Sequence, residues 1–312
     1  MPEAKEQWIE ITLSSPPELS DALSNFLIEM NTLGIIQEEG ESDAFEQEES
    51  IAGRDELKAY LPAVQESKEK IILLQRYIDS LSELFPALEK PAFTTVTVVD
   101  PGWEEQWKKF FKPLRVSRGI VIKPTWERYA PAGRDIVVDI DPGMAFGTGQ
   151  HPSTRMCIMA LEEIITKDRM HGSWNALDIG TGTGILAICC AKLGAEKVTA
   201  IDIDPRAVDI ASKNVAINGV GDRVTVINQD VETCDRVFDL IVANLTAATL
   251  TTYHAALIRM ISDGGYFIAS GIIDQDRDSI EETFRTEDLD IHDIGTEREW
   301  VCYVFHKRST TD

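Results

Sequence analysis

The sequence predicts an α/β protein whose larger part is an open, doubly wound parallel sheet, preceded by a small α+β domain. Three observations carry this expectation. From about residue 135, short apolar runs alternate with helical stretches, a pattern typical of a parallel sheet with helices on both faces. A glycine-rich turn, residues 180–184, follows the first run of this alternation. The last two apolar runs, residues 288–294 and 300–306, are joined by a short loop and predict an antiparallel hairpin.

Residues 1–98 are expected to form the small domain. The order of its elements is β-α-β-β-α-β, which is typical of a ferredoxin-like fold. Within it, residues 38–49 hold seven acids in twelve positions and predict a solvated loop. The strands are expected at residues 8–13, 34–38, 56–61 and 93–98, and the helices at residues 17–30 and 64–84.

Residues 99–134 are interpreted as a linker helix and connector, and residues 135–312 as the domain with the parallel sheet. In the connector, four aromatic residues at helical spacing predict a helix that packs its aromatic side between the domains: Trp103, Trp107, Phe110 and Phe111. The parallel strands are expected at residues 176–179, 198–203, 223–228, 238–243 and 265–270.

The charge balance bears on the partners. The chain of 312 residues has 53 Asp and Glu against 30 Lys and Arg, a net charge of −23. Nucleic-acid affinity depends largely on neutralising phosphates with basic side chains, so the balance disfavours direct nucleic-acid binding and favours a basic protein as partner. An acidic surface that only maintains solubility is the alternative.

Other features concern the compartment. No run approaches the roughly 20 apolar residues of a membrane span, and the N-terminus lacks the basic and apolar parts of a signal peptide. The five cysteines form no C-x-x-C pair and no metal-ligand spacing, and Cys189 and Cys190 fall in an apolar helix. We therefore expect reduced core cysteines, no metal site and a cytoplasmic location.

The glycine turn narrows the choice of ligand. Gly180, Gly182 and Gly184 form G-x-G-x-G, whereas a dinucleotide fingerprint reads G-x-G-x-x-G and would need a glycine where Ile185 stands. The spacing resembles the motif of class I methyltransferases that use S-adenosylmethionine (SAM). In that interpretation Gly180 and Gly182 let the methionine portion lie against the backbone, and a helix N-terminus favours its carboxylate.

An acid follows the next strand, as a ribose-binding site requires. Asp202 lies twenty-two residues after Gly180 and is placed to accept hydrogen bonds from ribose hydroxyls. Asp204 is its competitor, but Asp204-Pro205 is typical of the cap and first position of a helix. Asp202 is therefore the predicted ribose ligand.

Asn244 ends the fourth expected strand and is the candidate catalytic residue. Strand ends of this kind line the ligand crevice of an open parallel sheet. The amide oxygen of Asn244 can accept a hydrogen bond from an incoming amine and orient its lone pair toward a methyl donor. The structural alternative is an asparagine that merely caps a turn.

The segment Asp141-Pro-Gly-Met-Ala-Phe-Gly-Thr-Gly-Gln-His-Pro-Ser-Thr154 is the third candidate. Its three glycines predict a flexible loop, and its apolar Phe146 is expected to fold over the cofactor. His151 has no second His or Cys nearby, so a capping or structural role is expected rather than a metal site.

Together these segments resemble the PrmA-type methyltransferases, which modify the eleventh protein of the large ribosomal subunit. The resemblance covers about residue 103 to the C-terminus and includes Val242-Ala-Asn-Leu245; the family's Asn-Ile-Leu-Ala is Asn-Leu-Thr-Ala here. It implies SAM contacts at Thr154, Gly180, Asp202 and Asn244. It also implies methylation of lysine ε-amino and N-terminal α-amino groups, with substrate recognition by the first domain.

The predicted function is therefore a SAM-dependent protein N-methyltransferase, most simply a monomer, that acts on a large-subunit ribosomal protein. Three alternatives remain: methylation of exocyclic amines in nucleic acid, SAM binding without catalysis, and an NAD-dependent dehydrogenase. Enzymes of the first alternative usually carry Asn/Asp-Pro-Pro-Tyr/Phe after the fourth strand, whereas this chain has Leu245, Thr246 and Ala247 after the asparagine.

Overall fold

The computed structural model describes residues 7–30, 32–38, 54–99, 111–141, 149, 151–167, 170, 172–286 and 288–309. Its contacts divide the chain into two compact units, Met1–Phe110 and Phe111–Asp312. The predicted acidic loop at residues 38–49, except Glu38, and the aromatic segment, except Phe111, lie outside the described residues.

Unit 1 is a four-stranded antiparallel sheet with two helices. The strand order is β2-β3-β1-β4, which confirms the ferredoxin-like arrangement expected from the order of elements. Along β1 the buried side chains alternate, as at Ile11 and Leu13, because successive residues of a strand face opposite sides of the sheet. The elements are β1 (Gln7–Ser15), α1 (Pro17–Glu29), β2 (Leu33–Glu38), β3 (Asp55–Pro62), α2 (Gln65–Leu84) and β4 (Ala92–Val99).

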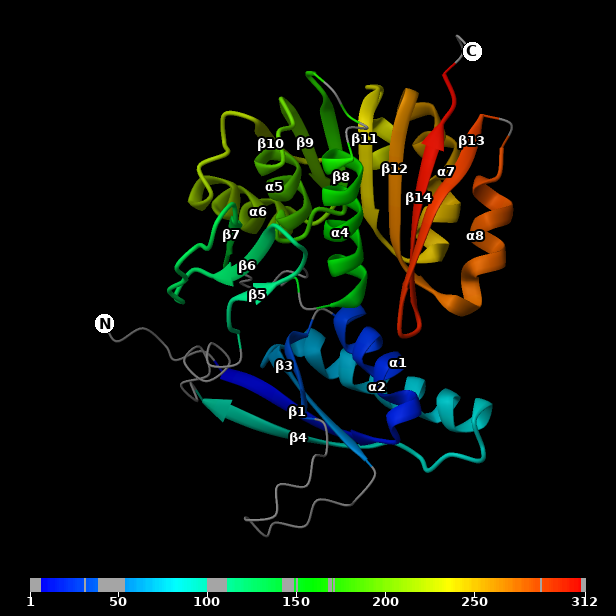
Figure 1. Ribbon diagram of the computed structural model, residues 1–312. Helices are drawn as coiled ribbons and strands as arrows, with labels where there is room; N and C mark the ends of the chain where they lie inside the picture. Colours follow the sequence, from blue (N-terminus) through cyan, green and yellow to red (C-terminus); the bar gives the residue numbers. More distant parts are fainter. Residues whose placement is uncertain are drawn as a thin grey trace. The chain divides into compact units, whose positions relative to one another are not determined.

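The core of unit 1 lies between this sheet and its two helices (Figure 1). Leu23 and Leu27 of α1 and Leu74 and Ile78 of α2 pack with the apolar side chains of β1 and β3 in one buried cluster. The helical spacing of these residues places them on one face of each helix. The predicted elements of the small domain are thus present.

Unit 2 begins with a small sheet in the order β5-β6-β7. Strand β5 (Leu114–Arg115) is antiparallel to β6 (Ile120–Pro124), and β6 is parallel to β7 (Ile136–Ile140). Residues 99–134 are predicted to be a linker helix and connector. Within this segment β6 pairs with β7, so residues 114–124 belong to the same unit as the large sheet.

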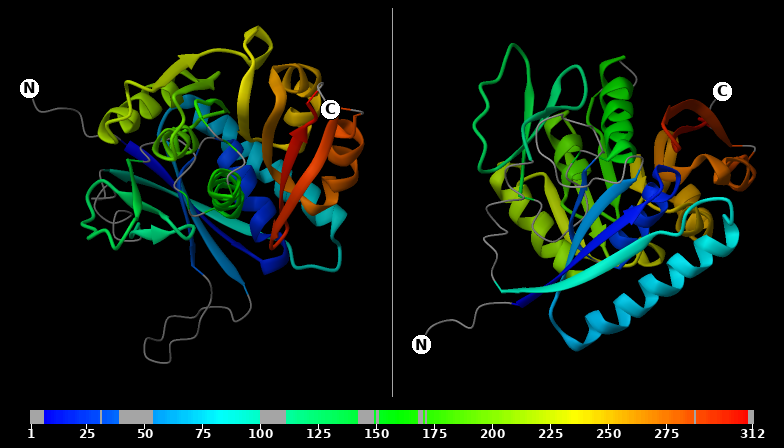
Figure 2. Two further views of the ribbon diagram at one scale, coloured as in Figure 1. Left: turned by 45° about the horizontal axis from the view of Figure 1, so that its top comes forward. Right: turned by 90° about the horizontal axis from the view of Figure 1, so that it is seen from below.

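The large sheet has the order β10-β9-β8-β11-β12-β14-β13. The first five strands are parallel, while β14 is antiparallel to β12 and to β13, so the predicted doubly wound sheet and terminal hairpin are confirmed. Figure 2 shows the hairpin at one edge of the sheet. The elements are α4 (Pro152–Thr166), β8 (Asn175–Ile179), α5 (Ile185–Lys192), β9 (Lys197–Asp202), α6 (Pro205–Ile217), β10 (Val224–Asn228), η2 (Val231–Thr233), β11 (Phe238–Asn244), α7 (Ala247–Met260), β12 (Ile261–Ile273), η3 (Asp274–Asp276), α8 (Arg277–Phe284), β13 (Leu289–Glu297) and β14 (Trp300–Lys307).

Two apolar layers enclose this sheet. One contains buried residues of α4 and α5 and Val215 of α6, and the other contains those of α7 and α8. Helix α5 is buried on all sides from Ile185 to Ala191, which explains why its sequence is apolar without an amphipathic period. Cys189 and Cys190 lie in it as free thiols, and burial raises the pKa of Cys189 to about 12. Both are core residues, as predicted.

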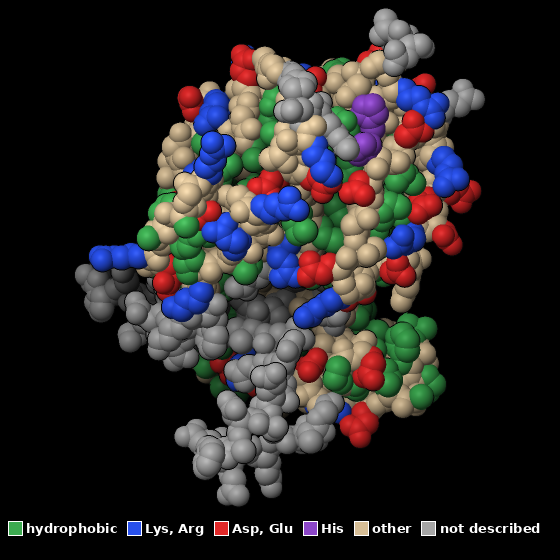
Figure 3. All heavy atoms as spheres, in the orientation of Figure 1, with side chains coloured by type: hydrophobic (Ala, Val, Ile, Leu, Met, Phe, Trp, Pro, Cys, Tyr) green, Lys and Arg blue, Asp and Glu red, His purple; other side chains and the backbone are tan. Residues whose placement is uncertain are grey.

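In Figure 3, basic and acidic side chains lie interspersed on the face toward the viewer. Within the described residues, the helices are all too short or too polar to cross a membrane.

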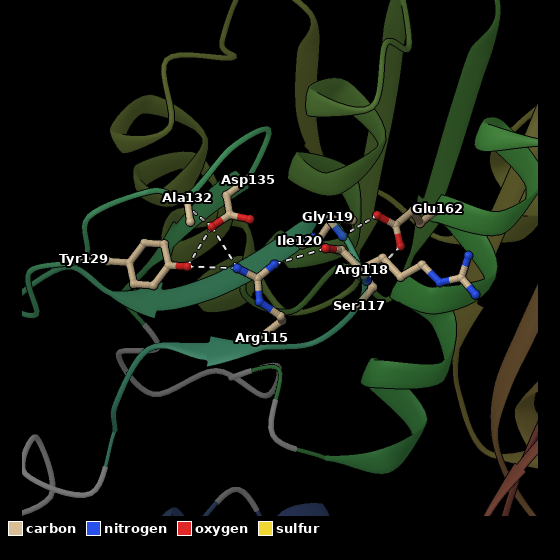
Figure 4. Close-up of polar contacts among 9 residues, drawn as sticks. All are labelled: Arg115, Ser117, Arg118, Gly119, Ile120, Tyr129, Ala132, Asp135 and Glu162. Atoms are coloured by element: carbon tan, nitrogen blue, oxygen red, sulfur yellow. Dashed lines mark hydrogen bonds and ion pairs between the residues drawn. The ribbon is translucent and has the colours of Figure 1, made fainter.

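The carboxylates of Asp135 and Glu162 form hydrogen bonds that stabilise the loops of the small sheet (Figure 4). The Asp135 carboxylate accepts hydrogen bonds from Ala132 N at 2.9 Å, the Tyr129 hydroxyl at 2.7 Å and Arg115 at 2.8 Å. The first two of these bonds, and then Arg115, hold the pKa of Asp135 below its usual value. On the other side, Glu162 of α4 accepts from the backbone N–H of Gly119 at 2.7 Å and thereby ties the β5–β6 turn to the large sheet's helix layer.

Candidate active site

The glycine turn connects β8 to α5 with three residues in the left-handed region. Gly180 has φ +67°, Gly182 +54° and Gly184 +82°. A Cβ on Gly180 would stand 2.6 Å from Leu245 Cδ2, and one on Gly184 would stand 3.2 Å from Ala211 Cβ. The turn therefore needs glycine for close approach as well as for conformation: Gly180 lies against the segment after β11, and Gly184 against α6.

Asp202 faces this turn from the end of β9. Its Oδ2 accepts a hydrogen bond from Gly182 N at 3.0 Å, and its Oδ1 accepts one from Asp204 N at 2.9 Å. Asp204 instead accepts from Arg206 N at 2.9 Å and caps α6, as its position before Pro205 predicted. Of the two acids, Asp202 is thus the one that the structure brings to the glycine turn.

Ile203, between these acids, was not singled out by the sequence analysis. Its side chain is 75% exposed, which is unusual for a large apolar residue directly after a buried strand. In the sequence, the local indication of this exposed residue is its position between two acids at the end of a predicted strand. It provides an apolar surface next to the candidate ribose ligand.

Asn244 ends β11 and meets the first turn of α4. Its Nδ2 donates a hydrogen bond to Thr154 Oγ1 at 3.1 Å, across 90 residues of sequence. Thr154 is only 1% exposed, and Asn244 is half-buried, so this bond is partly buried. A Cβ on Gly271 would stand 2.9 Å from Asn244 Oδ1, and glycine at that position leaves room for the amide. The bond to Thr154 fixes the Asn244 amide and leaves its oxygen as an acceptor.

His151 caps the N-terminus of α4. Its Nδ1 accepts a hydrogen bond from Ser153 N at 3.3 Å, and its ring meets Trp300 edge-on with centroids 4.6 Å apart. This confirms the predicted capping role. Among the described residues, no group of three or more potential metal ligands comes together. The predicted cofactor residue Phe146 lies outside the described residues.

Asp178 is a buried carboxyl group beneath the turn. Its Oδ2 accepts hydrogen bonds from Thr181 Oγ1 at 2.6 Å and Ala187 N at 3.0 Å, while its buried Oδ1 has no hydrogen-bond partner. Burial raises the pKa of Asp178 to about 7, against the lowering effect of its two donors. Asp178 falls within the predicted strand at residues 176–179, and its sequence position predicts no role for it.

These residues meet at the carboxyl edge of the large sheet, where open α/β sheets bind their ligands. Asp202 contacts the glycine turn at Gly182, Thr154 contacts Asn244, and the close approach of Gly180 to Leu245 connects the two pairs. The predicted site residues that the structure describes are thus brought to one place from β8, β9, β11 and α4.

The donor set fits SAM on two observations. The glycine turn leaves its backbone open to close approach by a ligand, since a Cβ on Gly180 would fill that space. The buried Oδ1 of Asp178, which has no hydrogen-bond partner among the described residues, places an acceptor beneath the turn, which suits a cationic ligand with an ammonium and a sulfonium group.

Comparison with known proteins identifies the relatives of this chain. The model of the family described as ribosomal protein L11 methyltransferase (PrmA) matches residues 7–308. A protein of that name from Pelobacter propionicus is 37% identical over 302 residues, covering 96% of this chain and 98% of its own length. Another, from Geobacter sulfurreducens, is 36% identical over 305 residues, covering 96% and 98%.

A solved structure agrees with these relatives. The crystal structure of a ribosomal protein L11 methylase from Lactobacillus delbrueckii subsp. bulgaricus is 31% identical and superimposes with a TM-score of 0.58. It covers 64% of this chain and 100% of the other. On the family match over nearly the whole chain and on these relatives, the chain belongs to the ribosomal protein L11 methyltransferase (PrmA) family.

Proposed function

We propose that this protein transfers methyl groups from SAM to lysine ε-amino and N-terminal α-amino groups of ribosomal protein L11. The observation that carries the proposal is the hydrogen bond from Asn244 to Thr154, which leaves an amide oxygen as acceptor at the carboxyl edge of the sheet. The names of full-length relatives support L11 as the substrate. The product of the proposed reaction is ribosomal protein L11 with methylated amino groups.

The cofactor residues in this proposal are Thr154, Gly180, Gly182, Asp202 and Asn244, with Phe146 from the loop before α4. When bound, SAM supplies an electrophilic methyl group on its sulfonium. The glycine turn and the N-terminus of α5 hold the methionine carboxylate, because backbone N–H groups and the helix dipole favour an anion there. Asp202 accepts from the ribose hydroxyls, and the exposed Ile203 offers an apolar surface for the base.

Asn244 orients the methyl acceptor. Its Oδ1 accepts a hydrogen bond from an N–H of the neutral amine, so that the nitrogen lone pair points toward the methyl group. The ammonium form of a lysine must lose a proton before it can attack, and water takes that proton. Catalysis in this scheme rests on positioning two reactants rather than on a general base.

The two units are proposed to have different roles, substrate recognition and methyl transfer. We assign substrate recognition to residues 1–98, a connector that includes strands β5 and β6 to residues 99–134, and methyl transfer to residues 135–312. The first 95 residues carry 20 Asp and Glu against 7 Lys and Arg, and a local charge of −13 attracts a basic substrate. The protein is proposed to act in the cytoplasm as a monomer, without membrane or direct nucleic-acid binding.

Replacing Asp202 with Ala is expected to raise the Kd for SAM about 10- to 100-fold. The change removes the charged acceptor for the ribose hydroxyls, and hydrogen bonds to a charged group are worth about 1.5–3 kcal/mol. Isothermal titration calorimetry with SAM measures the Kd. Asp204→Ala is the matched control, because Asp204 caps α6 without contacting the turn and its loss should lower stability but leave the Kd within about twofold. Equal affinities of both variants would move the ribose contact away from Asp202.

The proposed acceptor is tested with labelled SAM. The purified protein is incubated with L11 and, separately, with total RNA from the same cells. Transfer of label to L11 and none to RNA supports the proposal. Label in RNA with an unlabelled L11 would overturn it in favour of methylation of nucleic acid.

A further inference from the structure

Asn214 of α6 and Asn218, which caps the C-terminus of that helix, lie one helical turn apart and cover the edge of β7. The Oδ1 of Asn218 accepts a hydrogen bond from Asp139 N at 2.9 Å, and its Nδ2 donates to Asp139 O at 2.6 Å. The Oδ1 of Asn214 likewise accepts a hydrogen bond from Asp141 N at 2.9 Å, and its Nδ2 donates to Asp141 O at 3.0 Å. Asp139 lies in β7 and Asp141 directly follows it, two residues on, so the two amides take the place of a neighbouring strand.

The two amides differ in their remaining N–H. The second N–H of the Asn214 amide donates to Thr183 O in the glycine turn at 2.9 Å. The second N–H of the Asn218 amide donates instead to the backbone oxygen of Asn214 in α6, at 2.8 Å. Asn214 is fully buried, and so is Thr183. One side chain of α6 thus joins the backbone of the glycine turn to the end of β7.

The contacts around Asn214 place the turn rather than the ligand. Ala211, three residues earlier and therefore on the same side of α6, lies so close to Gly184 that a Cβ on Gly184 would stand 3.2 Å from Ala211 Cβ. Helix α6 therefore holds the turn at two consecutive points, Thr183 through a hydrogen bond and Gly184 through packing. At the other end of the same amide, Asp141 is the first residue of the segment that leads to Thr154.

We propose that Asn214 is a positioning residue of the cofactor site: its amide sets the spacing between the glycine turn and the segment that begins at Asp141. The role rests on the proposed function, because it assumes that SAM binds against the turn. Asn214 acts through Thr183 and Asp141 and has no part in the transfer step itself.

Aspartate is the informative replacement at both positions, because it keeps the shape and the acceptor oxygen but cannot donate. Asn214→Asp leaves the carbonyl oxygens of Asp141 and Thr183 without their donor and sets a carboxylate against them. Asn218→Asp does the same to Asp139 and to Asn214 O, while the bond to Thr183 stays intact. Comparing the two variants therefore separates the effect of losing a contact with β7 from the effect of losing the contact with the glycine turn.

The experiment measures SAM affinity by calorimetry, stability by thermal unfolding, and methyl transfer to L11 for the full-length wild type and both variants. Both variants should unfold at lower temperature than the wild type. Only Asn214→Asp should raise the Kd and the KM for SAM, by at least about tenfold, with kcat at saturating SAM within a few-fold of the wild type. A merely structural role would not separate affinity from stability in this way.

Equal SAM affinity of Asn214→Asp and Asn218→Asp would overturn the inference. If Asn214→Asp fails to fold, the same measurements are made on Asn214→Ser. The serine side chain is too short to contact Thr183 O and adds no charge. A wild-type protein that neither binds SAM nor methylates L11 would overturn the proposed function itself, and this outcome is distinct from equal variants in an active background.

Discussion

Replacing Asn244 with Ala is expected to lower the rate of methyl transfer to L11 about 100-fold, while SAM affinity changes by only a few-fold. The change removes the amide oxygen that orients the amine and the hydrogen bond to Thr154. Misplacing a reacting group by an ångström costs on the order of 100-fold in rate. Single-turnover kinetics at saturating SAM measure the transfer step, and calorimetry measures SAM affinity.

Two further variants separate the acceptor oxygen from the support of the amide. Asn244→Asp keeps an oxygen that can accept from the amine and should recover much of the rate. Thr154→Val keeps the shape of the buried side chain but removes the Oγ1 that holds the amide, so a smaller loss of rate is expected. An Asn244→Ala protein that transfers methyl groups at the wild-type rate would contradict the assigned role.

Replacing Asp178 with Asn is expected to remove a large pH dependence of the free energy of unfolding. The folded pKa of Asp178 is about 7, against 3.8 for the ordinary group. Between these values the folded state holds the proton more tightly than the unfolded state. Wild-type stability therefore falls as the pH rises from about 4 to 7, by up to about 4 kcal/mol from this group. Denaturant unfolding across this pH range measures the slope.

The amide preserves the local hydrogen bonds in this variant. Its oxygen can accept from Thr181 and Ala187, and its NH₂ group takes the side where Oδ1 has no partner. Other carboxyl groups titrate in the same range, so the quantity to compare is the difference between variant and wild type at each pH. Parallel curves for the two proteins from pH 4 to 7 would contradict the raised pKa.

Much of the fold was predictable because its signals are local. Alternating apolar runs and helical stretches predict a parallel sheet, and two strands without room for a helix predict the hairpin of β13 and β14. The sheet β5-β6-β7 was not predictable in this way. Its first strand has two residues, and the parallel pairing of Ile120–Pro124 with Ile136–Ile140 depends on tertiary contacts.

The candidate site was predictable where residues lie at strand ends. Gly180 directly follows a buried strand, and Asp202 and Asn244 each end one; the carboxyl ends of parallel strands meet at one edge. Thr154 came only from the family resemblance, because its contact with Asn244 spans 90 residues. Asn214 was missed because an asparagine within a helix carries no local signal of the two backbones that it joins.

The central claim is most directly tested by the mass of L11 purified from cells with and without this protein. We expect L11 from cells that contain it to be heavier by whole multiples of one CH₂ group, with the added mass on lysine or N-terminal amines. The added mass should disappear when the gene is deleted, return with the wild-type gene, and be largely absent with Asn244→Ala. L11 of identical mass in all four cell types would contradict the account.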